Sequence, residues 1–303
     1  MEKIACIIPT YFGRNLVNRL FDSLENQTIA FDTYIVDSSS EDGILELSIN
    51  RRINITVIPK KDFDHGGTRQ MMINKFSGYD FYVFITQDAY MVDESSIEKI
   101  IAPFKFSDVG AVYGRQLPHL NANLLAKHAR FFNYGDNESS RNISDIPRLG
   151  LKTAFMSNSF AAYRDKALKS IGGFPSNIIF AEDMFVAAKM LLAGWGIFYA
   201  ANAECRHSHN YSLSNEFKRY FDMGVFHSRE SWLVNSFGGA TGDGLKYCIS
   251  ELAFLGLHRI YLWPRSLIGN ALKFAGYKLG QQEVHIPTVL KRRLSMHSHY
   301  WGD

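Results

Sequence analysis

The amino-acid sequence predicts an α/β protein with a mostly parallel, mixed sheet flanked by helices, followed by a helical C-terminal extension. Three observations predict this fold. Short apolar runs rich in β-branched residues alternate with segments of helical periodicity in the first third of the chain. Polar residues follow the carboxyl ends of several runs, and beyond residue 237 apolar and aromatic helical segments carry scattered basic residues. We therefore expect a sheet domain over residues 1–237 and an extension over residues 238–303.

Length and composition limit the class of protein. With 303 residues, 46% hydrophobic and 21% charged, the chain has the balance of a folded globular protein. Its formal net charge of +3 argues against a nucleic-acid-binding protein, which usually carries a concentrated basic stripe. Three widely spaced cysteines argue against a disulfide framework and for a reducing compartment. Without a signal peptide or an apolar run of about 18 residues, we expect a cytoplasmic protein, soluble or peripheral at the inner face of the cell membrane.

Five short apolar runs are predicted to be strands, because each is rich in β-branched or aromatic residues and bounded by polar residues. They cover residues 4–9, 33–36, 53–58, 81–86 and 109–113. Helical segments separate most of them, which implies βαβ crossovers and a mostly parallel sheet.

Helix signals fill the intervals between these strands. Residues 15–26 carry apolar side chains at helical spacing, and Asn15 can cap the first turn. A turn at Gly66-Gly67 is expected to precede a helix through residues 71–76. The pattern Ser95-x-x-Glu98 is that of a capping box opening a further helix.

The second half of the sheet domain is less regular. Residues 119–149 are polar, with clusters of Asn and Ser, and are expected to form a loop. Order resumes over residues 153–163. A strong helix is predicted over residues 183–193, ended by Gly194 in a left-handed cap.

Polar side chains follow four of the predicted strands at the same edge of the sheet. Ligands of open parallel sheets bind beyond the carboxyl ends of the strands, so these residues are the first site candidates. They are Thr10 and Tyr11, then Asp37, then the segment 65–69, then Gln87 and Asp88. Each alone could serve as a turn or helix cap, but the four groups together predict a ligand site. A nucleotide could be held there by the Asp37 carboxylate, accepting from a base N–H, and by the Tyr11 ring packed on the base.

Two common nucleotide-binding classes are disfavoured. No Gly-x-Gly-x-x-Gly follows the first strand, and no phosphate-binding Gly-x4-Gly-Lys-Ser/Thr occurs, which argues against dinucleotide dehydrogenases and P-loop NTPases. A nucleotidyltransferase would need a glycine-rich, basic loop directly after the first strand. Residues 10–14 offer one Gly and one Arg, which is too little.

A set of short motifs in fixed order resembles family 2 glycosyltransferases, which have the GT-A fold. Within this family the chain is most similar to bacterial rhamnosyltransferases of cell-surface polysaccharide assembly, and the likeness covers about residues 4–215. The motifs, in order, are Ile-Pro-Thr-Tyr, Val-Asp-Ser-Ser-Ser, His-Gly-Gly-Thr-Arg-Gln, Thr-Gln-Asp-Ala, Gly-Gly-Phe, Ala-Glu-Asp and Arg-His-Ser-His-Asn-Tyr-Ser.

The resemblance implies a donor site for a nucleotide-sugar. Thr10, Tyr11 and Asp37 would hold the nucleoside, with Gln87 and Asp88 at the neighbouring strand end. Arg69 would lie near the diphosphate, a role suited to a permanently charged guanidinium. The adjacent glycines would let the backbone approach a phosphate closely.

Asp88 stands where the family has the last carboxylate of its metal motif. A divalent ion, Mg²⁺ or Mn²⁺, would neutralise the charge developing on the diphosphate leaving group. The segment Thr86-Gln87-Asp88 departs from the family pattern because it offers a single carboxylate. A third ligand would be His207, with His209 as a close competitor, and an ordinary loop histidine remains the alternative for each.

Asp183 is the expected general base, taking the proton from the acceptor hydroxyl with inversion at the anomeric carbon. The resemblance gives Glu182 a supporting role at the acceptor site. The structural alternative is simple, because acidic residues in the first helical turn complement the helix dipole. Under the functional interpretation, the helix N-terminus and a nearby metal should lower the pKa of Asp183.

The acceptor side is less defined by sequence. Gly173 and Asn158 are expected to shape it, and Trp195 or Tyr211 could stack on a sugar ring or simply pack in the core. The extension after residue 237 could dock on an anionic membrane, or pack on the main domain or on a second subunit in a homo-oligomer.

The sequence therefore predicts an inverting transferase that moves a sugar from a nucleotide-sugar to a saccharide acceptor. Resemblance alone suggests dTDP-L-rhamnose as donor and a lipid-linked polysaccharide precursor as acceptor. The alternative is a non-catalytic nucleotide-sugar-binding or scaffold protein of the same fold, favoured only by the reduced metal motif.

Overall fold

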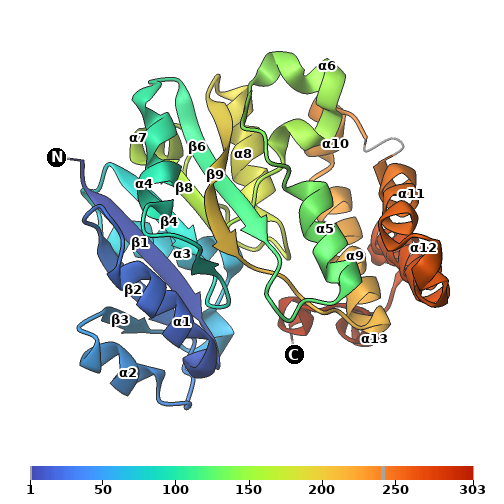
Figure 1. Cartoon of the computed structure of the whole chain (residues 1–303), viewed down its shortest axis with the longest axis horizontal. Helices are drawn as coiled ribbons and strands as arrows, with labels where there is room; N and C mark the ends of the chain where they lie inside the picture. Colours follow the sequence, from blue (N-terminus) through green and yellow to red (C-terminus); the bar gives the residue numbers. More distant parts are fainter. Residues whose placement is uncertain (1, 240–242, 303) are drawn as a thin grey trace.

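The computed structural model describes residues 2–239 and 243–302. A twisted sheet with helices on both faces forms one side of the molecule, and a group of long C-terminal helices covers the other side (Figure 1). Within the described residues the sheet has nine strands in the order β3-β2-β1-β4-β8-β6-β9-β5, with β7 paired to β9. This arrangement confirms the predicted mixed sheet with helical flanks.

The strand pairings show which part of the sheet is parallel. β1 is parallel to both β2 and β4, and β2 is parallel to β3, whereas β8 runs antiparallel between β4 and β6. The strands are β1 (Ile4–Thr10), β2 (Asp32–Asp37), β3 (Asn54–Val57), β4 (Phe81–Ile85), β5 (Tyr90–Met91), β6 (Val109–Leu117), β7 (Ser139–Arg141), β8 (Phe160–Arg164) and β9 (Gly196–Arg206).

Two hydrophobic layers form because side chains alternate across the strands. In β1, Ile4, Cys6 and Ile8 pack into one layer, while Ala5 and Ile7 pack into the other. Both layers are fully apolar at β1, which explains why its sequence is a continuous apolar run rather than an alternating one.

The helices in the described residues surround this sheet and extend beyond it. They are α1 (Arg14–Glu25), α2 (Ile44–Asn50), α3 (His65–Lys75), α4 (Ser96–Ile101), α5 (Leu124–Asn133), α6 (Ile146–Leu149), α7 (Asp165–Ser170), α8 (Glu182–Leu192), α9 (Leu213–Arg229), α10 (Ser231–Phe237), α11 (Asp243–Leu255), α12 (Trp263–Gly280) and α13 (Thr288–Leu294). None of them combines the length and apolar character that crossing a membrane requires.

The prediction of a loop over residues 119–149 is wrong. This stretch contains α5, β7 and α6. The side chain of Asn123 accepts a hydrogen bond from the Ala126 N–H at 2.8 Å and caps α5. The asparagines that suggested irregular structure therefore include a helix cap.

Two predicted helix starts are also corrected. Asn15 does not cap α1, which begins at Arg14 after Gly13. The predicted capping box at residues 95–98 does not form, because the Ser95 hydroxyl donates to Asp93 and the Glu98 carboxylate accepts from Thr28.

Gly66 and Gly67 lie in the first turn of α3 rather than in a turn before it. Asp64 caps this helix, and its Oδ1 accepts from the Gly67 N–H at 2.5 Å. A Cβ on Gly66 would overlap the Pro175 carbonyl, so this glycine allows α3 to approach the segment before α8. Gly194, with φ of +87°, ends the predicted α8 helix in a left-handed conformation as expected.

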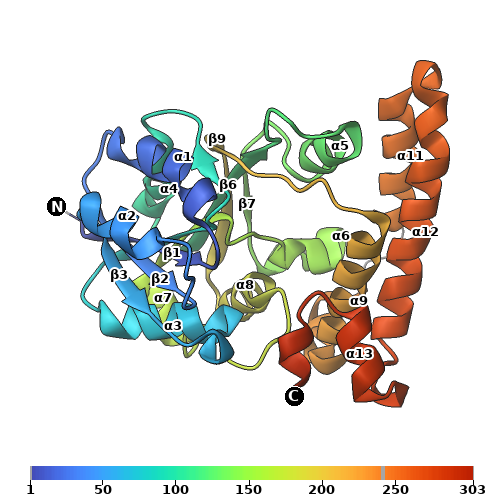
Figure 2. The same cartoon turned by 90° about the horizontal axis from the view of Figure 1, so that it is seen from below.

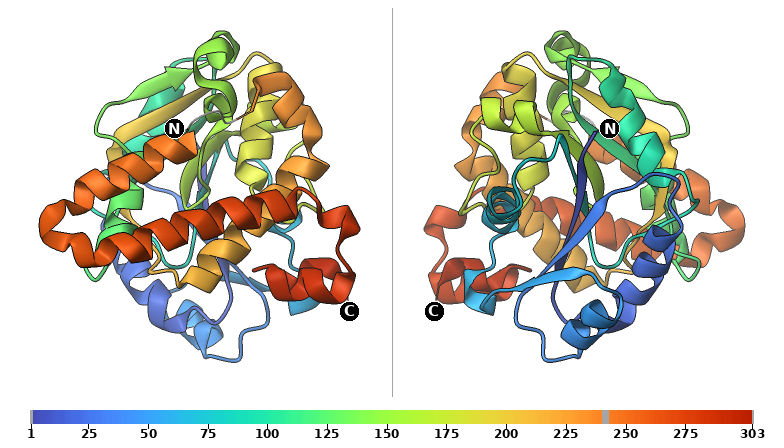
Figure 3. Two further views of the ribbon diagram at one scale, coloured as in Figure 1. Left: turned by 90° about the vertical axis from the view of Figure 1, so that its right-hand side faces the viewer. Right: turned by 90° about the vertical axis from the view of Figure 1, so that its left-hand side faces the viewer.

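The C-terminal helices pack closely against α9 (Figures 2 and 3). A Cβ on Gly224 of α9, or on Gly276 or Gly280 of α12, would collide with backbone atoms of the facing helix. α11 folds back along α12 and also contacts α5. The chain then turns through α13 to a short helix η7 (Ser298–Trp301), which returns toward the sheet domain.

Candidate active site

An open cavity of about 1090 Å³ lies at the carboxyl ends of β1 and β4 and continues toward the C-terminal helices. It unites residues that are far apart in the chain, and most of the predicted site residues line it. These are Thr10, Tyr11, Arg69, Gln87, Asp88, Asn158, Glu182, Asp183, His207 and His209. Among the described residues, Asp37 and Gly173 are the predicted site residues that do not contribute to its wall.

Asp37 is buried beneath the cleft, with an exposed fraction of 2%. Its Oδ1 accepts hydrogen bonds from the Thr10 hydroxyl at 2.8 Å and the Ser40 hydroxyl at 2.7 Å. Its Oδ2 accepts from the Ser40 N–H at 2.7 Å. In this structure the carboxylate therefore orders the ends of β1 and β2. The suggested contact of Asp37 with a base N–H stays a prediction.

Gln87 positions Tyr11 through two hydrogen bonds. The Tyr11 N–H donates to Gln87 Oε1 at 2.8 Å, and Gln87 Nε2 donates to the Tyr11 carbonyl at 3.1 Å. The Tyr11 ring is 37% exposed at the cleft, and Lys60 Nζ lies 4.6 Å from its centroid. Gln87 thus fixes the loop after β1, which holds the exposed aromatic ring at the cleft.

Asp88, His207 and His209 form a cluster whose potential ligand atoms lie within 4.8 Å of one another. Asp88 follows β4, and both histidines follow β9. Asp88 Oδ2 is 3.4 Å from His207 Nε2 and 3.6 Å from His209 Nδ1. Burial opposes ionisation of Asp88, but the hydrogen bond and positive charge of His207 outweigh it and lower the pKa of this carboxyl.

The tautomer of His207 fits the cluster to a metal ion. Arg130 Nη1 donates to Gln116 Oε1 at 2.5 Å, and His207 Nδ1 lies 2.8 Å from the same oxygen. Because an arginine can only donate, Gln116 Oε1 is the acceptor and His207 Nδ1 carries the hydrogen. In neutral His207 the lone pair is then on Nε2, the atom that faces Asp88.

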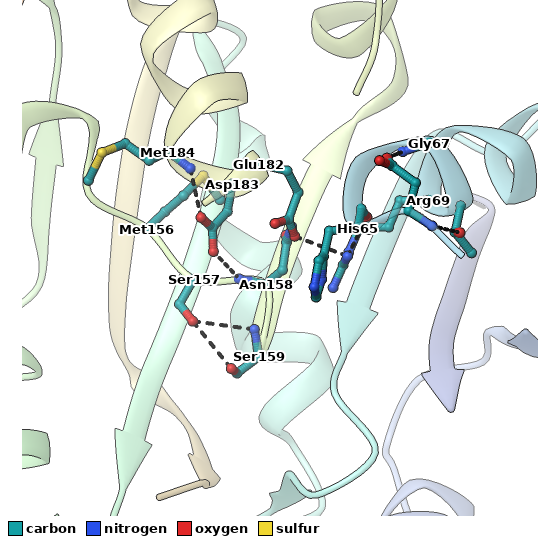
Figure 4. A network of polar contacts seen from close by, with 12 residues as sticks. His65, Gly67, Arg69, Met156, Ser157, Asn158, Ser159, Glu182, Asp183 and Met184 are labelled. Atoms are coloured by element: carbon teal, nitrogen blue, oxygen red, sulfur yellow. Dashed lines mark hydrogen bonds and ion pairs between the residues drawn. The ribbon is translucent and has the colours of Figure 1, made fainter. Parts of the chain in front are cut away.

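Asp183 lies in the first turn of α8, a helix that begins directly after Ala181, whose φ of 59° is left-handed. Its Oδ2 accepts from the Asn158 N–H at 3.1 Å and its Oδ1 accepts from the Met184 N–H at 2.8 Å (Figure 4). Burial and the neighbouring Glu182 charge raise the pKa of Asp183 to about 7. The expected lowering by the helix N-terminus is wrong, because these two effects are larger.

Glu182 points away from Asp183 toward Arg69 and His65 (Figure 4). Arg69 Nη1 is 3.0 Å from Glu182 Oε1, and both side chains are buried. Asn158 Nδ2 also donates to this oxygen at 2.9 Å. Burial opposes ionisation, but Arg69 and His65 lower the pKa of Glu182. Arg69, which the resemblance placed near a diphosphate, is thus engaged in a buried ion pair at the wall of the cleft.

Gly173 is also placed differently from the prediction. Its φ is +81°, and a Cβ there would overlap the Gln70 amide. Gln70 Oε1 accepts from the Phe174 N–H at 2.8 Å. Gly173 therefore shapes the turn that packs on α3, and it is not among the described residues that line the cleft.

The two aromatic candidates differ in position. Trp195 donates to the Ser170 hydroxyl at 2.9 Å and, in the described part of the chain, is not among the residues lining the cleft. Tyr211 does line the cleft, and its ring stacks on His209 with centroids 4.9 Å apart.

The segment after α13 contributes residues that sequence reasoning missed. His297 and His299 line the cleft, and His297 Nδ1 is 3.3 Å from His65 Nε2. The Met296 N–H donates to Asp222 Oδ2 at 2.8 Å, which ties this segment to α9. Burial lowers the pKa of both His65 and His297. The signal available in the sequence was the pair of histidines at i and i+2 near the end of the extension.

Comparison with known proteins gives consistent matches. Residues 5–172 match the family described as Glycosyl transferase family 2. The chain is 45% identical over 303 residues to the O-antigen chain rhamnosyltransferase RfbN of Salmonella typhimurium, covering 99% of this chain and 96% of that protein. It is 44% identical over 305 residues to the O-antigen chain rhamnosyltransferase WbaN of Salmonella anatum, covering 100% and 97% respectively.

Two solved structures illustrate the shared fold. The mannosyltransferase PcManGT from Pyrobaculum calidifontis, in complex with GDP-Man and Mn²⁺, is 17% identical with a TM-score of 0.57, over 99% of this chain and 84% of that chain. S. aureus TarS 1-349 in complex with UDP-GlcNAc is 14% identical with a TM-score of 0.53, over 93% and 91%. At these identities the likeness shows the fold alone.

Proposed function

This chain belongs to glycosyltransferase family 2, and from that membership we propose that it is an inverting rhamnosyltransferase of O-antigen assembly. The donor is dTDP-L-rhamnose and the acceptor is a hydroxyl of a lipid-linked polysaccharide precursor. The observation that carries the proposal is 45% identity, over nearly the full length of both chains, to a protein named as an O-antigen chain rhamnosyltransferase. A single cleft that joins a carboxylate–histidine cluster to a second buried carboxylate supports it.

Asp88, His207 and His209 would hold a divalent ion, which would neutralise the diphosphate leaving group when bound. The donor set has one carboxylate and two imidazoles. Because Mg²⁺ takes oxygen ligands almost exclusively, this set favours Mn²⁺ over Mg²⁺. Gln116 keeps the His207 Nε2 lone pair directed at the cluster.

Asp183 acts as the general base in this proposal. The acceptor oxygen forms a bond to the anomeric carbon of the donor, the bond from that carbon to the diphosphate breaks, and Asp183 takes the hydroxyl proton. Attack opposite the leaving group inverts the anomeric configuration. Backbone N–H groups of Asn158 and Met184 fix the carboxylate orientation, while Glu182 supports the acceptor side through Asn158.

The nucleoside of the donor is assigned to the loops after β1 and β2. Tyr11 offers an exposed ring for the base, held in place by Gln87, and Thr10 lines the same wall. For Asp37 to contact a base N–H, the Ser40 N–H and hydroxyl that occupy its oxygens must move aside. Arg69 acts indirectly, through the ion pair that keeps Glu182 charged.

A lipid-linked acceptor requires contact with a membrane surface, and the turn between α11 and α12 suits that contact. This turn is the short helix η5 (Leu257–Leu262), where Leu257 is 75% exposed and Tyr261 is 72% exposed. Over residues 244–282 the one acidic residue in the sequence is Glu251, which is buried, whereas five residues are Lys or Arg. Exposed apolar side chains with basic neighbours favour peripheral binding to anionic lipid.

The proposal is tested by assaying a panel of nucleotide-sugars for hydrolysis and transfer, with Mn²⁺ and with a chelator. Selective, chelator-sensitive turnover of dTDP-L-rhamnose is expected, and it would exclude a non-catalytic binding protein. The Asp183→Asn protein should bind the donor and transfer at a rate lower by about 10³-fold or more. Preference for another nucleotide-sugar would refute the donor assignment, and full turnover by Asp183→Asn would refute the base.

A further inference from the structure

The cleft continues past the histidine cluster into a space between α5, α9, α11 and α12. Six polar or aromatic side chains from three helices line this part, which we call the helical lobe. They are Glu216, Tyr220, Tyr247, Glu251, Arg265 and Lys273.

The lobe is built by helical spacing. Glu216 and Tyr220 are one turn apart on α9, Tyr247 and Glu251 are one turn apart on α11, and the two cations are two turns apart on α12. Gly269 lies midway between the cations. A Cβ there would come within 2.6 Å of Glu216 Oε2, so the glycine leaves room for that carboxylate.

Glu216 and Arg265 face each other with unused hydrogen-bonding capacity. Glu216 Oε2 lies 3.7 Å from Arg265 Nη1, and neither atom has a hydrogen-bond partner among the described residues. Glu251 is different, because it accepts from Ser266 at 2.5 Å and from Asn270 at 2.9 Å. Glu251 is therefore a structural residue of the α11–α12 contact, and Glu216 with Arg265 is the pair available to a ligand.

The lobe is connected to the histidine cluster. Arg265 Nη2 donates to the Tyr211 carbonyl at 2.9 Å, and the Tyr211 ring stacks on His209. A ligand that extends from the histidine cluster toward α12 would therefore contact first the polar groups of the cluster and then those of the helical lobe.

The charge balance of the lobe indicates the chemical class of the ligand. Glu216 and Glu251 offset Arg265 and Lys273, so the lobe as a whole does not attract a phosphate. Neutral sugar hydroxyls suit it, because each can donate to a carboxylate and accept from a guanidinium. The two tyrosines present apolar ring faces with polar tips, which complement the two faces of a sugar ring.

We infer that the helical lobe binds the acceptor glycan at a sugar beyond the one that receives the new residue. The inference rests on the proposed transferase function and adds a second saccharide subsite to it. The C-terminal helices then select longer acceptors by contacting a part of the glycan that does not react.

The test compares two synthetic acceptors that share the same non-reducing terminal sugar. One is the methyl glycoside of that sugar, and the other is the methyl glycoside of the trisaccharide that ends in it, taken from the polysaccharide of the producing strain. Kinetic constants are measured for the unmodified chain, Glu216→Gln and Arg265→Gln. Glu46→Gln, an exposed acid on the remote helix α2, serves as the matched control.

The unmodified chain should have a lower KM for the trisaccharide than for the monosaccharide. Each lobe variant should raise the KM for the trisaccharide about tenfold, the effect of losing one hydrogen bond to a charged group. The KM for the monosaccharide should change much less, and Glu46→Gln should change neither value.

Equal effects on both acceptors, or a lowered melting temperature with loss of kcat for both, would assign the pair a structural role and overturn the subsite. Equal KM values for both acceptors with the unmodified chain would also overturn it while leaving the transferase function intact. Failure to transfer sugar to either acceptor would overturn the transferase function and the subsite together.

Discussion

Gln116 Oε1 accepts hydrogen bonds from both Arg130 Nη1 and His207 Nδ1, at 2.5 and 2.8 Å. This relationship sets the tautomer of a histidine that lies beside Asp88. It also makes Gln116, an interior residue of β6, a positioning residue for the histidine cluster without any contact to a ligand.

Replacing Gln116 with Leu should weaken Mn²⁺ binding by about 10- to 100-fold, because the His207 ring loses the acceptor that orients it. Calorimetric titration with Mn²⁺ measures this directly and does not depend on turnover. Gln282→Leu, at an exposed position, is the control and should bind Mn²⁺ normally. Unchanged affinity in Gln116→Leu would show that the tautomer is set in another way.

The pH dependence of transfer should report the ionisation of Asp183. Because burial and Glu182 raise the pKa of this carboxyl to about 7, kcat/KM should rise with pH through that region as the base becomes ionised. Rates measured between about pH 5 and 9 test this. A profile that is flat below neutrality would remove Asp183 as the titrating base.

The ionisation of Asp183 should also affect folding stability, which should fall with rising pH while the transfer rate rises. A carboxyl whose pKa is raised in the folded state stabilises the protein below its unfolded pKa, and this contribution is lost as pH rises toward about 7. As pH rises over this range, the melting temperature of Asp183→Asn should therefore fall less than that of the unmodified chain. Part of the loss should remain, since burial also raises the pKa of Asp222 to about 6.

Breaking the buried pair between Arg69 and Glu182 should be costly. Arg69→Met leaves the Glu182 charge buried without its cation, and should lower the free energy of unfolding by about 3–5 kcal/mol. Denaturant unfolding provides the measurement. The double variant Arg69→Met, Glu182→Met should be less destabilised than the sum of the two single variants, and strict additivity would contradict a direct coupling.

The contact between α9 and α12 should be sensitive to a single methyl group. Gly280→Ala places a Cβ against the Phe221 backbone and should destabilise the fold by about 1–3 kcal/mol. Gly244→Ala is the matched control on α11, because its Cβ meets no atom within 4 Å. Thermal unfolding should separate the two variants, and equal melting temperatures would mean that the helices move apart at little cost.

Membrane contact should depend on the turn between α11 and α12. Leu257→Glu and Tyr261→Glu should each weaken sedimentation with vesicles containing anionic phospholipid by about tenfold, since each removes one exposed apolar side chain from the contact. Ile49→Glu is the control, because Ile49 is also an exposed apolar residue but lies on α2, and this variant should bind the vesicles normally. Retained binding by both turn variants would place any membrane contact elsewhere.

The sequence predicted the first four strands along the chain well, because each appears as a short run rich in apolar and β-branched residues. It did not predict the antiparallel placement of β8, since strand neighbours depend on packing between distant segments. The resemblance to family 2 glycosyltransferases pointed to Asp88 and to His207 or His209, and the structure brings all three together. The role of Gln116 could not, because it depends on which side chains the register of β6 and β9 brings together.

Long-range contacts explain the remaining differences. The resemblance placed Arg69 and Asp37 at the donor site. The structure shows that both also bind other protein groups, and their contact with a donor stays a prediction. The contact between His65 and His297 joins residues 232 positions apart, and no local pattern encodes such a contact. The residue types thus indicated which side chains are candidates for the site. Which other side chains each of them contacts could be learned only from the folded structure.

Because His297 and its neighbours form part of the cleft wall next to His65, the order of synthesis matters for this cleft. A ribosome makes residues 65, 88 and 183 long before it makes residue 297. The part of the cleft wall formed by the residues beyond α13 is therefore the last to be synthesised, after all the candidate site residues in the sheet domain.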